Sequence, residues 1–163
     1  MDEKWAPIKE FPNYSVSNLG RVHNHDTGRI LKESTTKNGL VKIGLMKDRK
    51  QYFRGVAHLV AEAFVKVSND LHDTPTHLDG DSSNNRADNL IWRPRWFAWK
   101  YSRQFRERTP YHTQGPILDV KAGVWYVDML EVATTHGLLV DDVRRSVIFK
   151  KPVFPTRQVF SFE

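Results

Sequence analysis

The 163-residue chain contains no cysteine. Without thiols it can form neither a disulfide bond nor a cysteine-ligated zinc site, and this composition fits a reducing cytoplasm. Long apolar runs are also missing, since no segment approaches the roughly 18 apolar residues that a membrane-spanning helix needs. The opening segment, MDEKWAPIKEF, lacks the basic start and apolar stretch of a secretory signal. We therefore expect a cytoplasmic protein with no membrane span.

Acidic residues are also in short supply. The chain has 19 Asp and Glu against 25 Lys and Arg, which gives a formal charge of +6 and a pI of about 9.6. A basic excess favours polyanionic partners, because binding to them releases condensed counterions. A merely soluble basic protein would show the same totals, so the distribution of the charges has to decide between the two interpretations.

The first third of the sequence alternates between β-rich runs and turn residues. Gly20, Gly28 and Gly39 mark turns, and residues 48–50 mark the tip of a hairpin. Such punctuation by Gly, Asn and Asp is typical of antiparallel hairpins. The expected strands are residues 14–18, 21–24, 29–31, 40–46 and 51–54.

Residues 56–65 follow a different period. Leu59, Val60, Ala63 and Phe64 recur on one face of a helix. A polar loop over residues 68–75 comes next.

The segment 76–92 is rich in turn-forming polar residues. Asp79-Gly80 is a strong turn signal, and the β-rich residues 90–92 close the segment. A helix is expected to begin near residue 93. The order of strand, ordered loop, strand and helix predicts a ββα unit. Side chains that can hold its loop in one shape by bonding to nearby backbone are Asn84, Asn85, Asp88 and Asn89.

The tail from residue 117 predicts a second small unit. Two strands are expected around Ala122-Gly123, and a final strand over residues 158–162. Helices over 129–136 and 140–148 flank Gly137, which suggests a helix-turn-helix. Its expected core is Leu130, Val132, Ala133, Leu138, Val143 and Val147, with Arg144, Arg145 and Ser146 facing outward.

Taken in order, these segments resemble phage-type HNH homing endonucleases. Residues 5–22, which run from WAPI to FPNYSVSNLGRV, are similar to the N-terminal module found before phage HNH nucleases. The string LVAEAF at 59–64 resembles the helix that leads into their catalytic motif. Residues 77–92, HLDGDSSNNRADNLIW, are similar to the HNH motif itself, and the tail resembles their C-terminal helix-turn-helix module.

The resemblance implies a nuclease site with one histidine base and one hard divalent ion. By this resemblance His77 is the general base and Asn89 braces the loop that positions it. The ion would be Mg²⁺, which prefers oxygen ligands. The protein would need this ion only if it cuts DNA; otherwise no cofactor is expected.

Two positions depart from the family pattern. The family places Asp or Asn before the histidine, but here Thr76 stands there, and a second ligand position falls at or near Ala98. Neither supplies a good magnesium ligand. Asp79 and Asp81 could in principle recruit a metal instead, although such residues more often only form the turn. We therefore expect a degenerate metal site with no assured ligand.

Cations and aromatics interleave after residue 92. Arginines can bind phosphates or enter a narrow minor groove, while apolar side chains can wedge between base steps. At helical spacing Trp92, Trp96 and Trp99 share a stripe, so we expect these tryptophans to lie mostly in the core. The candidate DNA-binding residues are Arg93, Arg95, Lys100, Arg103 and Arg106, together with Arg144, Arg145 and Lys150 of the tail.

The sequence thus predicts an α+β chain: antiparallel β-hairpins, a ββα-metal-type HNH core, a basic helical connector and a small C-terminal module of β-strands and a helix-turn-helix. The expected domains are residues 1–92, with the ββα helix continuing to about 105, then a basic aromatic helix and linker over 93–115, and the C-terminal module over 116–163.

The predicted function is binding to double-stranded DNA, as a monomer derived from an HNH homing endonuclease with impaired or lost cutting. Two alternatives remain open. One is an active Mg²⁺-dependent nickase that uses His77. The other is a phage-encoded factor that binds a host protein. The family resemblance suggests the cytoplasm of a phage-infected bacterial cell as the location.

Overall fold

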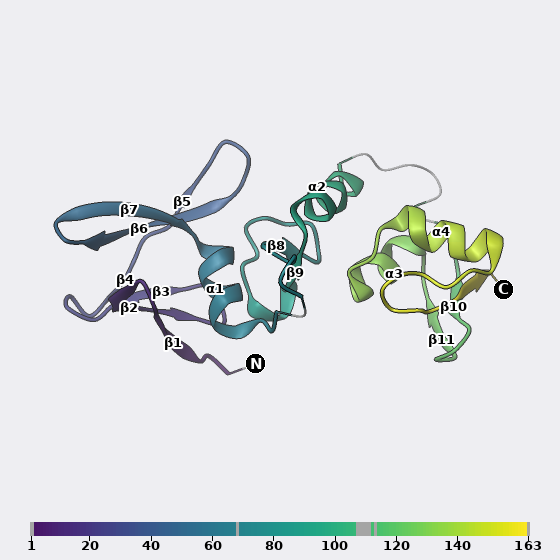
Figure 1. The fold of residues 1–163 in the computed structure, drawn as a ribbon, viewed down its shortest axis with the longest axis horizontal. Helices are drawn as coiled ribbons and strands as arrows, with labels where there is room; N and C mark the ends of the chain where they lie inside the picture. Colours follow the sequence, from purple (N-terminus) through teal and green to yellow (C-terminus); the bar gives the residue numbers. More distant parts are fainter. Residues whose placement is uncertain (1, 68, 107–111, 113, 163) are drawn as a thin grey trace. The chain divides into compact units, whose positions relative to one another are not determined.

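The computed structural model describes residues 2–67, 69–106, 112 and 114–162. It confirms the α+β class, with several antiparallel sheets and helices (Figure 1). The chain forms two compact units, residues 1–98 and 99–163. The predicted three-part division is finer than this, and residues 107–111 and 113 of its predicted helix and linker (93–115) lie outside the described ranges. No helix of the described residues is both long and apolar enough for a membrane span.

Two antiparallel sheets form the first part of the N-terminal unit. Both follow the hairpin pattern expected from the turn residues. The first sheet has the order β1-β2-β3-β4 and the second β5-β6-β7. Their strands are β1 (Trp5–Ile8), β2 (Phe11–Ser17), β3 (Val22–Asn24), β4 (Arg29–Ile30), β5 (Ser34–Thr35), β6 (Val41–Lys47) and β7 (Lys50–Gly55).

Strands β1 and β5 were not among the strands predicted from the sequence. Each lies at the edge of its sheet. β1 contains Pro7, a residue that argues against a central strand but is tolerated at an edge. β5 has only two residues, Ser34 and Thr35, both exposed, so it carries no hydrophobic alternation to recognise.

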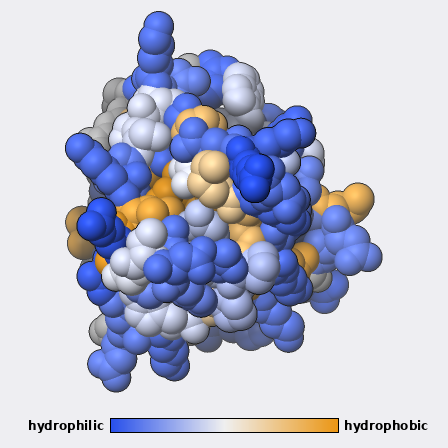
Figure 2. Space-filling model, turned by 90° about the vertical axis from the view of Figure 1, so that its left-hand side faces the viewer, coloured by the Kyte–Doolittle hydropathy of each residue, from blue (hydrophilic) through white to orange (hydrophobic). Residues whose placement is uncertain are grey.

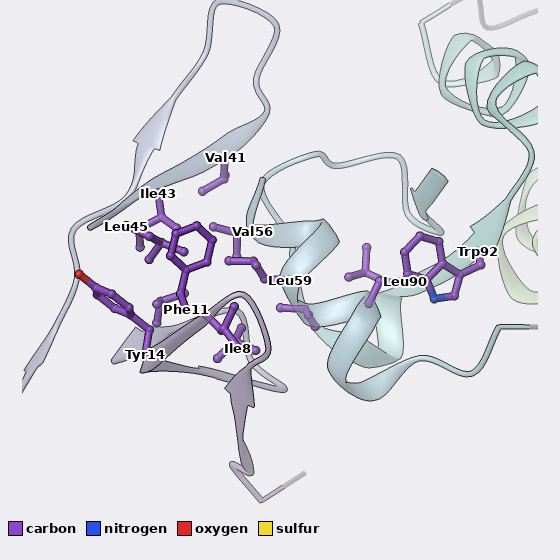
Figure 3. Close-up of a cluster of buried hydrophobic side chains, with 14 residues drawn as sticks. Ile8, Phe11, Tyr14, Val41, Ile43, Leu45, Val56, Leu59, Leu90 and Trp92 are labelled. Atoms are coloured by element: carbon purple, nitrogen blue, oxygen red, sulfur yellow. The ribbon is translucent and has the colours of Figure 1, made fainter. Parts of the chain in front are cut away.

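Helix α1 (Val56–Phe64) lies at the centre of this unit and contacts strands of both sheets and of the ββα unit. Its buried side chains Val56 and Leu59 lie between the sheet residues on one side and Leu90 and Trp92 on the other (Figure 3). The Trp92 indole Nε1 also donates a hydrogen bond of 3.1 Å to the Val65 carbonyl, just beyond the end of α1. The ββα unit is therefore fixed against the helix that precedes it.

The ββα unit has the predicted order. Strand β8 (Thr74–His77) pairs antiparallel with β9 (Leu90–Arg93), and the short 3-10 turn η1 (Ala87–Asn89) precedes β9. Helix α2 (Arg95–Gln104) follows directly.

The C-terminal unit packs two helices on a three-stranded sheet of order β11-β10-β12. Its predicted core is confirmed: Val132, Ala133, Leu138, Val143 and Val147 are buried and Leu130 packs against them. The elements are β10 (Ile117–Asp119), β11 (Val124–Tyr126), α3 (Met129–His136), α4 (Val140–Phe149) and β12 (Phe160–Phe162).

Local signals explain the ends of α3. The Asp128 carboxylate accepts a 2.8 Å hydrogen bond from the Glu131 amide, which is an N-terminal cap. Gly137 ends the helix in the left-handed conformation, with a φ of 61°. One detail of the next helix was predicted wrongly. Ser146 is buried rather than outward-facing, and its Oγ accepts a hydrogen bond from the Phe160 amide.

The prediction that the tryptophans lie in the core is wrong for two of the three. Trp92 is 5% exposed, but Trp96 is 62% and Trp99 58% exposed. The reason is that Trp92 belongs to β9, so it shares no helical stripe with the other two. The side of α2 that is buried carries Tyr101 instead.

Candidate active site and nucleic-acid interface

The pairing of β8 with β9 positions the candidate histidine. His77 lies opposite Leu90, and Thr76 lies opposite Ile91. The Leu78 amide donates a 2.8 Å hydrogen bond to the Asn89 carbonyl, which extends the ladder by one residue. Because successive strand side chains point to opposite faces, Thr76 is buried at 5% exposure while His77 is only half-buried.

The ring of His77 is held by Asn85. The distance from His77 Nε2 to Asn85 Oδ1 is 3.0 Å. The Asn85 amide Nδ2 donates to the Ser83 carbonyl, which turns its oxygen toward the imidazole. Since an amide oxygen only accepts, Nε2 carries the proton in this arrangement and Nδ1 is the basic nitrogen. An imidazole so oriented can accept a proton from water.

Asn89 spans the loop between the two strands. Its Oδ1 accepts a hydrogen bond from the Asp79 amide at 3.1 Å, and its Nδ2 donates to Asp79 Oδ1 and to the Asn84 carbonyl, each at 2.9 Å. These bonds tie both ends of the loop to one side chain. The arrangement is the one that a bracing role requires.

The two candidate acids accept hydrogen bonds within the same loop. Asp79 Oδ1 also accepts from the Asp81 amide, and Oδ2 accepts from Asn84 Nδ2 at 2.7 Å. Asp81 Oδ1 accepts from the Ser83 hydroxyl and amide, and these bonds lower the pKa of the Asp81 carboxyl. Both carboxylates therefore stabilise the turn.

A turn of the N-terminal sheet supports the loop from outside. The Ala87 amide donates a 2.9 Å hydrogen bond to the Asn18 carbonyl. Gly20, at a φ of 92°, packs so closely that a Cβ there would lie 3.2 Å from the Asn85 Cβ. Sequence reasoning missed this support and the contact of Asn85 with His77. Only the glycine at a turn gave a local signal of close approach.

The residues at the two expected ligand positions do not fit a magnesium ion. Thr76 offers a neutral, buried hydroxyl that lies 3.4 Å from the Thr74 carbonyl, and Ala98 has only a methyl group. Mg²⁺ is normally bound through carboxylates. Among the described residues, no group of three or more His, Asp or Glu side chains is placed to hold a metal ion.

The candidate DNA-binding cations occupy different environments. Arg93 is buried at 8% exposure, where its Nη1 donates to the Trp92 carbonyl and its guanidinium lies 5.5 Å from the Phe97 ring centroid. Arg93 therefore packs inside the N-terminal unit, and its burial argues against the predicted role as a DNA contact. The remaining candidates are exposed: Arg95, Lys100, Arg103, Arg106, Arg144, Arg145 and Lys150.

The comparisons with known proteins agree with this geometry. Residues 3–45 match the NUMOD4 motif. The chain is 35% identical over 89 residues to the "Uncharacterized HNH endonuclease L247" of Acanthamoeba polyphaga mimivirus, which covers 55% of this chain and 22% of that relative. It is 36% identical over 90 residues to the DNA endonuclease I-HmuI of Bacillus phage SP01, with 55% of this chain and 51% of the relative covered.

The fold leads to the same group. A solved structure of the HNH homing endonuclease I-HmuI, on DNA binding and cleavage, superposes with a TM-score of 0.57 and 24% identity, and the match covers 98% of each chain. The chain spans between about a fifth and a half of the length of the curated relatives it matches. The NUMOD4 motif, the similarity to HNH endonucleases and the shared fold together support an assignment to the HNH homing endonucleases.

Proposed function

We propose that this chain binds double-stranded DNA and cuts it weakly or not at all. One observation carries the proposal. The loop that holds His77 retains the hydrogen bonds of Asn85 and Asn89, while the two positions where the family pattern places metal ligands carry Thr76 and Ala98. In this proposal the family scaffold persists as a DNA-binding device, whereas the metal chemistry is impaired.

The charges of the described surface support binding to a polyanion. Seven of the candidate cations are exposed, and the pair α3–α4 presents Arg144 and Arg145 on its outer side. We propose that this pair acts as a helix-turn-helix, with α4 as the helix that enters the major groove. A relative whose solved structure concerns DNA binding and cleavage shares the whole fold.

The sheet β5-β6-β7 offers a second basic surface. The Lys42 ammonium lies 4.9 Å from the ring centroid of Phe53, which is 55% exposed, and Met46 on the same strand as Lys42 is 50% exposed. Seen from the side on which β6 and β7 lie, most of the surface is hydrophilic with a smaller apolar area (Figure 2). A two-stranded ribbon with cations fits the width of a major groove.

A second candidate function is Mg²⁺-dependent nicking with His77 as general base. The observation that favours it is the Asn85 contact, because it leaves Nδ1 of the imidazole able to accept a proton from water. Nicking would then need a metal held by ligands other than residues 76 and 98.

Two measurements test the proposal. Duplex binding, followed by fluorescence anisotropy over a series of salt concentrations, should weaken steeply with salt as counterions are released. In parallel, supercoiled plasmid is incubated with the protein and Mg²⁺, next to His77→Ala and the control His58→Ala. We expect salt-dependent binding with little or no nicking. Nicking that His77→Ala abolishes and His58→Ala retains would favour the nickase instead, and duplex affinity that ignores salt would overturn DNA binding.

A further inference from the structure

The C-terminal unit contains a groove. It lies between the C-terminal half of α2 and the first turn of α4 and has a volume of about 410 Å³. Ligand sites for small molecules typically fall in this range of size. Its lining residues include Trp99, Lys100, Arg103, Asp142 and Arg145.

Specific contacts fix the two walls of this groove. Gln104 Oε1 accepts a 3.0 Å hydrogen bond from the Val140 amide, which is the first residue of α4. The Tyr101 hydroxyl, on a side chain only 1% exposed, donates to the Ala133 carbonyl at 3.4 Å. Hydrogen bonds thus hold the C-terminal end of α2 against α3 and α4, and they fix the walls of the groove.

The α2 wall combines an open aromatic ring with positive charge. Trp99 is 58% exposed, and the guanidinium of Arg103 lies 4.5 Å from its ring centroid. Lys100 is the next residue, and Arg145 faces the groove from α4. Aromatic rings next to cations in an open groove are the combination with which proteins bind unpaired nucleotides, because every base has a face that can stack.

The α4 wall adds an acceptor. Asp142 is half-buried, and its Oδ1 lies 3.9 Å from the Arg145 guanidinium. The pKa of this carboxyl is raised, mainly by burial and also by the charge of Asp141, while Arg145 and Lys100 partly offset the shift. A carboxylate would repel a phosphate, but it can accept a hydrogen bond from the exocyclic amino group of a base.

We propose that this groove holds one unpaired nucleotide of a DNA strand. The base stacks on Trp99, its amino group donates to Asp142, and its phosphates lie near Lys100, Arg103 and Arg145. A base inside a duplex cannot bind this way, because its faces are covered by its neighbours. Cytosine should be preferred to thymine, since thymine has no exocyclic amino group. This inference deepens the proposed DNA binding by adding a second kind of DNA ligand.

The test uses the full chain with short single-stranded oligo(dC) and oligo(dT) at neutral pH, with fluorescence anisotropy as readout. The variant Trp99→Ala should weaken strand binding by about tenfold, in line with the stacking energy per base. The matched control is Trp125→Ala, which removes another half-exposed indole of the same unit that does not line the groove. Asp142→Asn should strengthen overall strand binding, because a negative charge is lost, and reduce the preference for oligo(dC) over oligo(dT).

Duplex affinity, measured beside these values, separates the two proposals. If Trp99→Ala loses strand binding and keeps duplex binding, the groove is assigned as stated. If the chain binds strands but no duplex, the groove stands and the proposed duplex function fails. Equal strand affinities of Trp99→Ala and Trp125→Ala would overturn the groove proposal. Displacement of oligo(dC) by an equal nucleotide concentration of dCMP would overturn the assignment to a strand in favour of a free nucleotide.

Discussion

Gly20 and Gly28 both adopt a positive φ, of 92° and 68°, but their surroundings differ. A Cβ at Gly28 would meet nothing within 4 Å, whereas one at Gly20 would lie 3.2 Å from the Asn85 Cβ and 3.4 Å from its carbonyl oxygen. Gly28→Ala should therefore lower the free energy of unfolding by about 1 kcal/mol, the cost of a positive φ for a residue with a Cβ. Gly20→Ala should lower it by about 1–3 kcal/mol more, because its Cβ also overpacks the site.

Chemical unfolding of both variants checks this difference, and the NMR signals of His77 report on the loop. Gly20→Ala should shift these signals through Asn85, while Gly28→Ala should leave them in place. Equal destabilisation by the two substitutions would mean that the contact between Gly20 and the loop has no energetic weight.

A second prediction at this scale concerns pH. In the C-terminal unit, His136 Nε2 lies 2.8 Å from the Tyr126 hydroxyl, and Asp119 is 1% exposed and accepts from the Gln158 amide. Burial lowers the pKa of His136, although the charge of Asp119 partly offsets this. The folded state therefore favours the neutral imidazole. Its stabilisation is present above the unfolded pKa of about 6.5 and is lost as the pH falls.

Thermal unfolding between about pH 7.5 and 5.5 checks this expectation. The melting temperature of the C-terminal unit should fall over this range, and His136→Gln should remove most of that fall. The control His58→Gln, which replaces an exposed histidine of the N-terminal unit, should retain it. An unchanged pH profile in His136→Gln would show that another group is responsible.

At the scale of elements, the cap of α4 is unusual because it comes from another helix. Leu139, at the N-cap position, provides no side-chain hydrogen bond, and Gln104 Oε1 accepts from the Val140 amide instead. Gln104→Ala should therefore destabilise the C-terminal unit by about 0.5–2 kcal/mol, the usual effect of a lost cap. Gln104→Glu keeps an acceptor and adds a favourable charge at a helix N-terminus, so it should stay close to the parent.

Urea unfolding followed by circular dichroism measures these differences. Ser102→Ala is the matched control, since its Oγ donates only within α2, to the Trp99 carbonyl. If Gln104→Ala and Ser102→Ala unfold at the same denaturant concentration, the interhelical cap does not stabilise α4.

An element can be predicted from the sequence when the interactions that define it join residues close together in the chain. Helices α1, α3 and α4 have apolar periods, so they could be predicted, and Asp128 and Gly137 give local signals for the two ends of α3. The exposure of Trp96 and Trp99 could not be predicted, because the residue at which α2 begins after β9 decides which side of the helix is buried. The Gln104 cap joins residues 36 positions apart and has no local pattern.

At the scale of the whole molecule, the HNH motif is a short-range sequence pattern, whereas the contacts that support its loop come from residues far away in the sequence. The HNH resemblance pointed to His77 and Asn89 from the sequence, and their loop contacts are the ones such roles need. The support from Asn18 and Gly20 depends on how the NUMOD4 segment folds onto the loop, and no short-range pattern encodes that packing. The motif therefore points to candidate site residues, and the fold shows which contacts hold them in place.

If cutting is lost only because residues 76 and 98 cannot ligate a metal, restoring ligands should restore it. The double substitution Thr76→Asp with Ala98→Asn supplies the oxygen ligands that the family pattern places there. Mg²⁺-dependent nicking of supercoiled plasmid should then rise by at least about tenfold, since even outer-shell partners of a metal change activity by that factor.

Because residue 76 is buried, an aspartate there is costly without a partner, so Mg²⁺ should also raise the melting temperature of the double variant and not that of the parent. Adding His77→Ala should abolish the gained nicking while it leaves this thermal shift in place, since that imidazole is the base in this proposal. A double variant that binds Mg²⁺ by the thermal readout yet fails to nick would show that His77 and its loop, as well as the ligands, have lost the catalytic geometry.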